Sequence, residues 1–144
     1  MHGLHFCAAL VVAAELWHLL RGERRLALAW LVLGLSTLLL QGTLKPIFGR
    51  PRPELWPWFV HPTGLAFPSG HALASATFYP FLGWVVSLRR RAPLRLWWLP
   101  GVAVALFVGG GRLYLGVHWP SDVLAGWALG AAQTGLAIWW LGRK

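Results

Sequence analysis

Long apolar stretches alternate with short polar ones along the chain, and five of the apolar stretches are long enough to form helices. They cover residues 4–20, 26–44, 72–88, 94–109 and 121–141. A helix that crosses a bilayer needs roughly 17–25 mainly apolar residues, and in lipid it satisfies its own backbone hydrogen bonds. The pattern therefore predicts an all-α integral membrane bundle of about five transmembrane helices, in a single membrane-embedded domain that spans residues 1–144.

The composition excludes the soluble alternatives. Of the 144 residues, 57% are hydrophobic and only 12% are charged, whereas a soluble domain has about 25% charged residues. A domain of this size cannot hide so much apolar surface from water, and a disordered chain is far more polar. The lipid bilayer is therefore the expected partner of most of the surface. The single Cys7 allows no internal disulfide.

Positive charge is distributed unevenly over the polar stretches. The net charge is +9, and five crossings place most of the basic residues on one face of the membrane: Arg21, Arg24, Arg25, Arg89, Arg90, Arg91, Arg95, Arg143 and Lys144. The positive-inside rule assigns that face to the cytoplasm, and it assigns residues 45–71 and 110–121 to the outside. The distribution favours a role in membrane orientation over nucleic-acid binding, so no nucleic-acid partner is expected.

The outer loops contain residues that suit a phosphate group. Phosphoryl transfer requires fixed donors around the phosphoryl oxygens, and Lys45, Arg52 and Arg112 can supply them. Ser69 and Gly70 immediately precede the third apolar segment, where the backbone N–H groups of a helix start favour an anion. Ser69 can cap the helix or donate a hydrogen bond, and Gly70 lets the backbone approach the phosphate closely.

A nucleophile and a general acid can be assigned among the histidines of these loops. His118 and Asp122 are four residues apart, and Pro120 suits the first position of a helix. Asp122 can accept from one ring N–H and leave the other nitrogen free to attack phosphorus. His71 has no such partner in the sequence and is the better general acid. Each of these residues alone is more often a helix cap or an interfacial group, but the set on one face favours a phosphate site.

Three motifs within residues 45–122 resemble those of the type 2 phosphatidic acid phosphatase superfamily, in the same order. They are Lys45, six residues and Arg52-Pro53; then Pro68-Ser69-Gly70-His71; then Arg112, five residues, His118, three residues and Asp122. The resemblance implies a helical membrane phosphatase that needs no metal or other cofactor. It implies that the nucleophile, its partner and the general acid are His118, Asp122 and His71. It also implies a phosphate cradle formed by Lys45, Arg52, Ser69, Gly70 and Arg112.

The sequence departs from the family pattern in two places. The third motif usually begins with Ser-Arg, whereas here Gly111 precedes Arg112, so one hydroxyl donor is lost and we expect reduced activity at most. Bacterial members commonly have six spanning helices, and only two predicted helices precede Lys45. A reduced bundle and a further helix before residue 1 are the two alternatives.

Together these features predict a lipid phosphatase that hydrolyses a phosphate monoester or pyrophosphate through a phosphohistidine. Undecaprenyl pyrophosphate is favoured, because a site on the extracytoplasmic side of a bacterial inner (plasma) membrane meets that carrier where it is released. Phosphatidylglycerophosphate and phosphatidic acid stay open as substrates. The alternative is a catalytically impaired member that binds or transports phospholipid or polyprenyl-phosphate headgroups. A vanadium haloperoxidase is disfavoured by the five apolar segments.

Three weaker signals complete the expectations. Gly126 and Gly130 form a small-residue pair, for which packing within the monomer is favoured over a homodimer. Glu15 and His18 have a spacing seen in metal sites, but a local salt bridge near the cytoplasmic end is favoured. Arg50 and His61 lie in the long outer loop and can contact a second phosphate or a headgroup, which nothing in the sequence requires.

Overall fold

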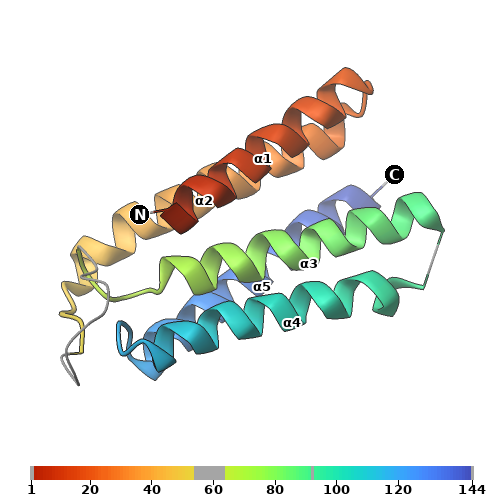
Figure 1. The fold of residues 1–144 in the computed structure, drawn as a ribbon. Coiled ribbons are helices and arrows are strands. Elements are labelled where there is room, and N and C mark those ends of the chain that lie inside the picture. The colour runs from red at the N-terminus through yellow and green to blue at the C-terminus, as the bar shows by residue number, and fades with distance from the viewer. Residues whose placement is uncertain (1, 54–63, 92, 144) are drawn as a thin grey trace.

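The computed structural model describes residues 2–53, 64–91 and 93–143, and within them the chain forms five α-helices and no strand. The helices are α1 (His2–Leu20), α2 (Arg24–Phe48), α3 (Gly70–Arg90), α4 (Leu94–Tyr114) and α5 (Pro120–Gly142). Consecutive helices run in opposite directions, so that the bundle has two distinct ends (Figure 1). The prediction of an all-α bundle of five helices is confirmed.

Helix α3 is the centre of the bundle and contacts each of the other four helices. Two glycines of α5 bring the α5 backbone close to it. A Cβ atom on Gly126 would lie 2.8 Å from the carbonyl oxygen of Ser69, and one on Gly130 would lie 2.7 Å from that of Leu73. Small residues permit such close approach between membrane helices. Packing of this glycine pair within the monomer is therefore confirmed, and it fixes the start of α5 against the start of α3.

The outer surface of the bundle is apolar. Large side chains such as Leu20, Leu39, Phe107 and Leu136 are more than half exposed, which would be costly in water. Among the described residues, two helical stretches are long and apolar enough to cross a membrane, namely Arg24–Phe48 and Leu96–Tyr114. The distribution is that of a membrane-embedded protein, with lipid as the solvent of the outer surface.

Arginine and tryptophan side chains pair at the end of the bundle that holds the α1–α2 and α3–α4 turns. The Arg21 guanidinium stacks on Trp17 at 4.6 Å, and that of Arg143 stacks on Trp139 at 4.1 Å. Arg25 also donates to the backbone carbonyls of Trp140 and Arg143, and so ties the start of α2 to the end of α5. Tryptophan and arginine are typical of a membrane interface. The predicted clustering of basic residues at one end is confirmed for those that the structure describes.

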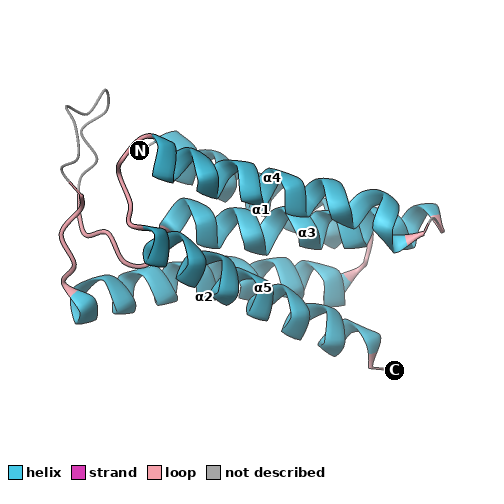
Figure 2. Ribbon diagram, turned by 90° about the horizontal axis from the view of Figure 1, so that it is seen from below, coloured by secondary structure: helices cyan, strands magenta, loops and turns pink. Residues whose placement is uncertain are grey.

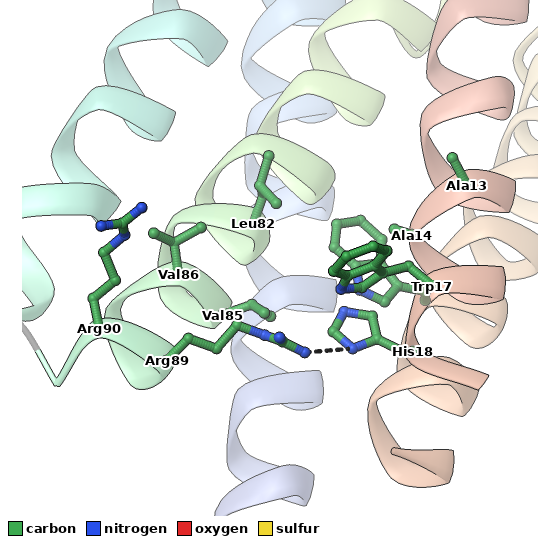
Figure 3. A pocket seen from close by; sticks show the side chains of 10 residues that line it. Ala13, Ala14, Trp17, His18, Leu82, Val85, Val86, Arg89 and Arg90 are labelled. Atoms are coloured by element: carbon green, nitrogen blue, oxygen red, sulfur yellow. Dashed lines mark hydrogen bonds between the residues drawn. The ribbon is translucent and has the colours of Figure 1, made fainter. Parts of the chain in front are cut away.

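A cavity of about 590 Å³ lies between α1 and α3 near that same end. Figure 3 shows Arg89 reaching across its mouth from α3 toward His18 of α1. His18 is buried, and its Nδ1 lies 2.6 Å from a Glu23 carboxylate oxygen, which also accepts from Arg89. The local salt bridge at this end is thus between His18 and Glu23, the residue that precedes α2.

Two helices run further than the apolar pattern indicates. Helix α2 continues past Lys45 and Pro46 and ends where Gly49 adopts a left-handed conformation, with φ of 52°. Helix α4 continues through the glycines after residue 108, although glycine disfavours helices. Gly109 is needed there because the Trp127 ring occupies the space that a Cβ atom would take, at 2.4 Å. Lys45 and Arg112 therefore lie in the last turns of helices rather than in loops.

Candidate active site

The ends of α2 and α4 meet the starts of α3 and α5 at the second end of the bundle, opposite the α1–α2 and α3–α4 turns (Figures 1 and 2). All the site residues predicted from the sequence lie at this end. Lys45 and Arg112 come from helix ends, and Arg52 comes from the loop after α2. Ser69, Gly70, His71, His118 and Asp122 lie at or just before the starts of α3 and α5.

His118 and Asp122 are held by the start of α5. Pro120 is the first residue of the helix, so His118 precedes it and Asp122 lies in its first turn. The Asp122 carboxylate is fully buried, and its Oδ2 accepts from the Trp119 backbone N–H at 2.8 Å. The same oxygen lies 3.4 Å from His118 Nδ1. The expected approach of the carboxylate to one ring nitrogen is therefore present.

The other ring nitrogen of His118 faces a cation. Arg52 places one guanidinium nitrogen 3.1 Å from His118 Nε2, and the same nitrogen donates to the Val117 carbonyl at 2.9 Å. A guanidinium group can only donate, so Nε2 carries the lone pair and Nδ1 carries the proton on the side of Asp122. This is the tautomer in which Nε2 can act as a nucleophile.

Lys45 fixes the chain that leads into α3. Its Nζ donates to the carbonyl oxygen of Leu65 at 2.7 Å and contacts that of Pro68 at 3.4 Å. Arg52 holds the same stretch of chain, because its Nε donates to the Gly64 carbonyl at 3.0 Å. Both cations therefore lie against the backbone just before the predicted phosphate-binding turn, with their charges close to His118.

The turn at the start of α3 is arranged as an anion site. Ser69 precedes the helix, and its backbone N–H donates to the Asp122 carbonyl at 3.0 Å. Of the two roles that the sequence left open for Ser69, capping is absent, and the buried Oγ has no partner among the described residues. The first amides of a helix have no intrahelical acceptor. The Gly70 and His71 amides are thus available together with the Ser69 hydroxyl.

Arg112 reaches the site from the last turn of α4. Its Nε is buried without a hydrogen-bond partner in the described part of the chain, and its charge acts on His71. Gly111 has open space around the position of a Cβ atom, with nothing within 4 Å. The serine that is usual in this motif would therefore fit without any rearrangement.

Arg50 takes a role that the sequence did not predict. It donates to the second carboxylate oxygen of Asp122 at 3.0 Å and to the Ser121 hydroxyl at 2.6 Å, and it stacks on Trp119. Arg50 thus holds the carboxylate of Asp122, the predicted partner of His118. The only signal for this role in the sequence was the position of Arg50 directly after Gly49, where the chain turns. His61, the other loop residue expected to contact a second phosphate or a headgroup, lies outside the described residues.

The surroundings of His118 keep its imidazole neutral. Burial, followed by the positive charges of Arg52 and Lys45, lowers the pKa of His118 to about 3. A neutral imidazole is the nucleophilic form. Three cations, a neutral histidine whose Nε2 carries a lone pair, and a helix start therefore converge on one region. Such an arrangement can bind a phosphate group and attack it.

Comparison with known proteins agrees with the motifs. The sequence profile of the PAP2 superfamily matches residues 26–144, and the chain belongs to this superfamily. Its fold is similar to the crystal structure of a transmembrane PAP2-type phosphatidylglycerolphosphate phosphatase from Bacillus subtilis, with a TM-score of 0.84 and 30% identity. That match covers 96% of this chain and 70% of the Bacillus chain.

Several curated relatives are phosphatases of lipid substrates. The chain is 39% identical over 109 residues to an undecaprenyl-diphosphatase from Sulfolobus acidocaldarius. This match covers 75% of this chain and 48% of that protein. It is also 36% identical over 97 residues to phosphatidylglycerophosphatase B from Bacillus subtilis. That match covers 64% of this chain and 46% of the Bacillus protein. The chain thus spans about half the length of these curated relatives.

Proposed function

We propose that the protein is a lipid phosphatase that hydrolyses a phosphate monoester or a diphosphate through a phosphohistidine on His118. The observation that carries this proposal is the environment of the His118 ring. Asp122 lies on the side of Nδ1 and Arg52 faces Nε2, so a nucleophilic lone pair points toward a group that binds phosphate. Arginine matches the geometry of phosphate oxygens.

The proposed reaction has two steps. The Nε2 lone pair of His118 attacks phosphorus, the bond from phosphorus to the lipid oxygen breaks, and His71 gives its proton to the leaving oxygen. Asp122 stabilises the positive charge that develops on the ring. Water then attacks the phosphohistidine, His71 accepts the proton of that water, and inorganic phosphate leaves while His118 returns to its neutral form. Lys45, Arg52, Arg112 and the α3 amides hold the phosphoryl oxygens throughout.

Undecaprenyl diphosphate is the substrate we favour. The relatives named as an undecaprenyl-diphosphatase and a phosphatidylglycerophosphatase B both support a lipid diphosphate or monoester. The cluster of arginines at the far end of the bundle supports an orientation in which the site faces away from the cytoplasm. A bacterial inner membrane with an outward-facing site suits a carrier lipid that is released on that side.

The activity is tested by phosphate release from purified protein in detergent. The substrates are undecaprenyl diphosphate, phosphatidylglycerophosphate and phosphatidic acid, each with EDTA present. We expect release that survives EDTA and falls about a thousandfold or more in His118→Ala. His18→Ala, a buried histidine at the opposite end, is the matched control and should retain activity. Folded wild-type protein that releases phosphate from none of these lipids would contradict the proposal.

The orientation is tested separately by cysteine labelling in intact cells. In a Cys7→Ser background, Ser121→Cys and Arg91→Cys place single thiols at exposed positions at the two ends of the bundle. A membrane-impermeant maleimide should modify the first variant and leave the second unmodified until the cells are opened. The reverse pattern would show that the site faces the cytoplasm.

A further inference from the structure

Gln41 is a buried polar residue next to the phosphate-binding turn that neither the motifs nor the proposed reaction uses. It lies on α2 one helical turn before Lys45, so the two side chains share a face of the helix. The residue is only 7% exposed, and its Nε2 has no hydrogen-bond partner among the described residues. An amide donor buried in this way is destabilising unless something accepts its hydrogen bonds.

The carboxamide of Gln41 packs directly on Gly70. A Cβ atom on residue 70 would lie 2.8 Å from Gln41 Cδ and closer still to Oε1. Glycine at this position leaves the space that the side-chain amide of Gln41 fills, and a Cβ atom there would displace the carboxamide. The carboxamide thus lies at the start of α3, with Oε1 nearest to the Gly70 Cβ position and Nε2 3.4 Å from it, beside the first amides of the helix.

The other buried polar atoms of the site show the same property. The Ser69 hydroxyl and Arg112 Nε are also buried without a hydrogen-bond partner in the described residues. Both belong to residues predicted to bind phosphate. Gln41 is adjacent to this group through Gly70, and its amide N–H is a donor of the kind that a phosphoryl oxygen accepts.

We propose that Gln41 is a further phosphate-binding residue, whose side-chain amide donates to the phosphate group held at the start of α3. The inference rests on the proposed function, because it takes this turn to be the phosphate site. It adds a neutral donor on the inner side of the turn, one helical turn deeper along α2 than Lys45. It also gives a reason for glycine at position 70.

Binding of orthovanadate, a phosphate analogue, tests the inference without any lipid. Its affinity for the purified protein in detergent is measured by isothermal titration calorimetry. Gln41→Met removes the donor while keeping the length of the side chain, and Gln41→Glu keeps the size but adds a negative charge. We expect at least tenfold weaker vanadate binding in the first variant and a larger loss in the second.

Gln133→Met is the matched control. Gln133 of α5 is a second glutamine whose Nε2 is buried without a described partner, but its Oε1 accepts from Ser36 and Thr37 far along the bundle. It lies eleven residues after Asp122, roughly 16 Å along the helix. We expect its vanadate affinity to stay within twofold of wild type. If a folded Gln41→Met variant also bound vanadate with an affinity within twofold of wild type, the inference would be overturned.

A double-mutant cycle tests the contact itself and keeps the inference falsifiable if one variant folds poorly. Gly70→Ala should weaken vanadate binding strongly when Gln41 is present, because the new methyl group displaces the carboxamide. In a Gln41→Ala background, the same change should have a much smaller effect. Equal effects in both backgrounds would show that Gln41 and Gly70 act independently and would overturn the inference.

The outcomes also separate this inference from the proposed function. Wild-type protein that binds vanadate but hydrolyses no lipid would refute the proposed activity, while the Gln41 variants would still report on the phosphate site. Wild-type protein that binds no vanadate would refute both. Hydrolysis together with an unchanged affinity in Gln41→Met would refute the role of Gln41 alone.

Discussion

Replacing Arg50 with alanine is expected to lower kcat for phosphate release about tenfold while leaving KM nearly unchanged. Arg50 contacts the carboxylate of Asp122 and the hydroxyl of Ser121. Its removal leaves one oxygen of a fully buried carboxylate without its charged donor. Asp122 is then held less firmly beside His118, and the charge that develops on the ring during attack is stabilised less well.

The size of the effect follows from the geometry. A hydrogen bond to a charged group contributes about 1.5–3 kcal/mol. The Arg50 side chain is 36% exposed, so water can replace part of what is lost, and the lower end of that range applies. About 1.4 kcal/mol corresponds to a factor of ten in rate. The Trp119 backbone N–H still holds the other carboxylate oxygen, which limits the loss.

The assay measures kcat and KM separately, on a lipid monophosphate and on a lipid diphosphate. Arg24→Ala, an exposed arginine at the opposite end of the bundle, controls for the loss of one positive charge. Arg50→Lys should recover only part of the activity, because an ammonium group lacks the planar fork of arginine. A rise in KM confined to the diphosphate would show that Arg50 binds a second phosphate, and it would refute this reasoning.

Three further predictions test the remaining parts of the site and the fold. Gly111→Ser should raise kcat/KM by about twofold to tenfold through one added hydroxyl donor, since open space surrounds the position of a Cβ atom; lower activity in steady-state assays of a folded variant would contradict this. Because the pKa of His118 is lowered to about 3, its neutral form persists as pH falls below 6.5. The loss of kcat/KM due to protonation of His118 should therefore occur near pH 3, and Arg52→Gln should move this loss to higher pH. If kcat/KM of the wild type instead fell near pH 6.5, and Arg52→Gln did not move that fall, the low pKa of His118 would be contradicted. Gly130→Ala should destabilise the bundle by about 1–3 kcal/mol in thermal unfolding, whereas Gly135→Ala, with nothing within 4 Å, should be neutral; equal stabilities would refute the packing argument.

The sequence predicted the helices well because a membrane helix is specified by length and apolarity alone. The ends of α2 and α4 were less predictable. Pro46 and the glycines after residue 108 are signals for helix termination, yet both helices continue. At Gly109 the reason is tertiary, since the Trp127 ring fills the space beside its backbone. Contacts of this kind between distant residues cannot be read from local propensity.

The site was predictable where the residue types themselves determine the chemistry. His118, Asp122 and the cations come together as their spacing indicates. The contact of Arg50 with Asp122 and the packing of Gln41 on Gly70 were missed, because each joins residues that are distant in sequence. For Ser69 the sequence left capping and hydrogen-bond donation open, and only the structure shows that the hydroxyl does not cap the helix. Which hydrogen bonds these side chains make depends on how the helices pack at this end of the bundle.

The balance of charge at the site explains how one histidine can serve as both nucleophile and carrier of the phosphoryl group. Arg50 and Asp122 form an ion pair, so the carboxylate whose charge acts on Lys45 and Arg52 is already paired with Arg50, and positive charge remains in excess at the site. Burial and this positive excess hold the pKa of His118 low, so Nε2 is unprotonated before substrate binds. A bound phosphate then offsets the cations with its own negative charge. In the proposed reaction, the positive charge that forms on the ring during attack is therefore stabilised by the bound phosphate as well as by Asp122, which favours the transition state over the ground state.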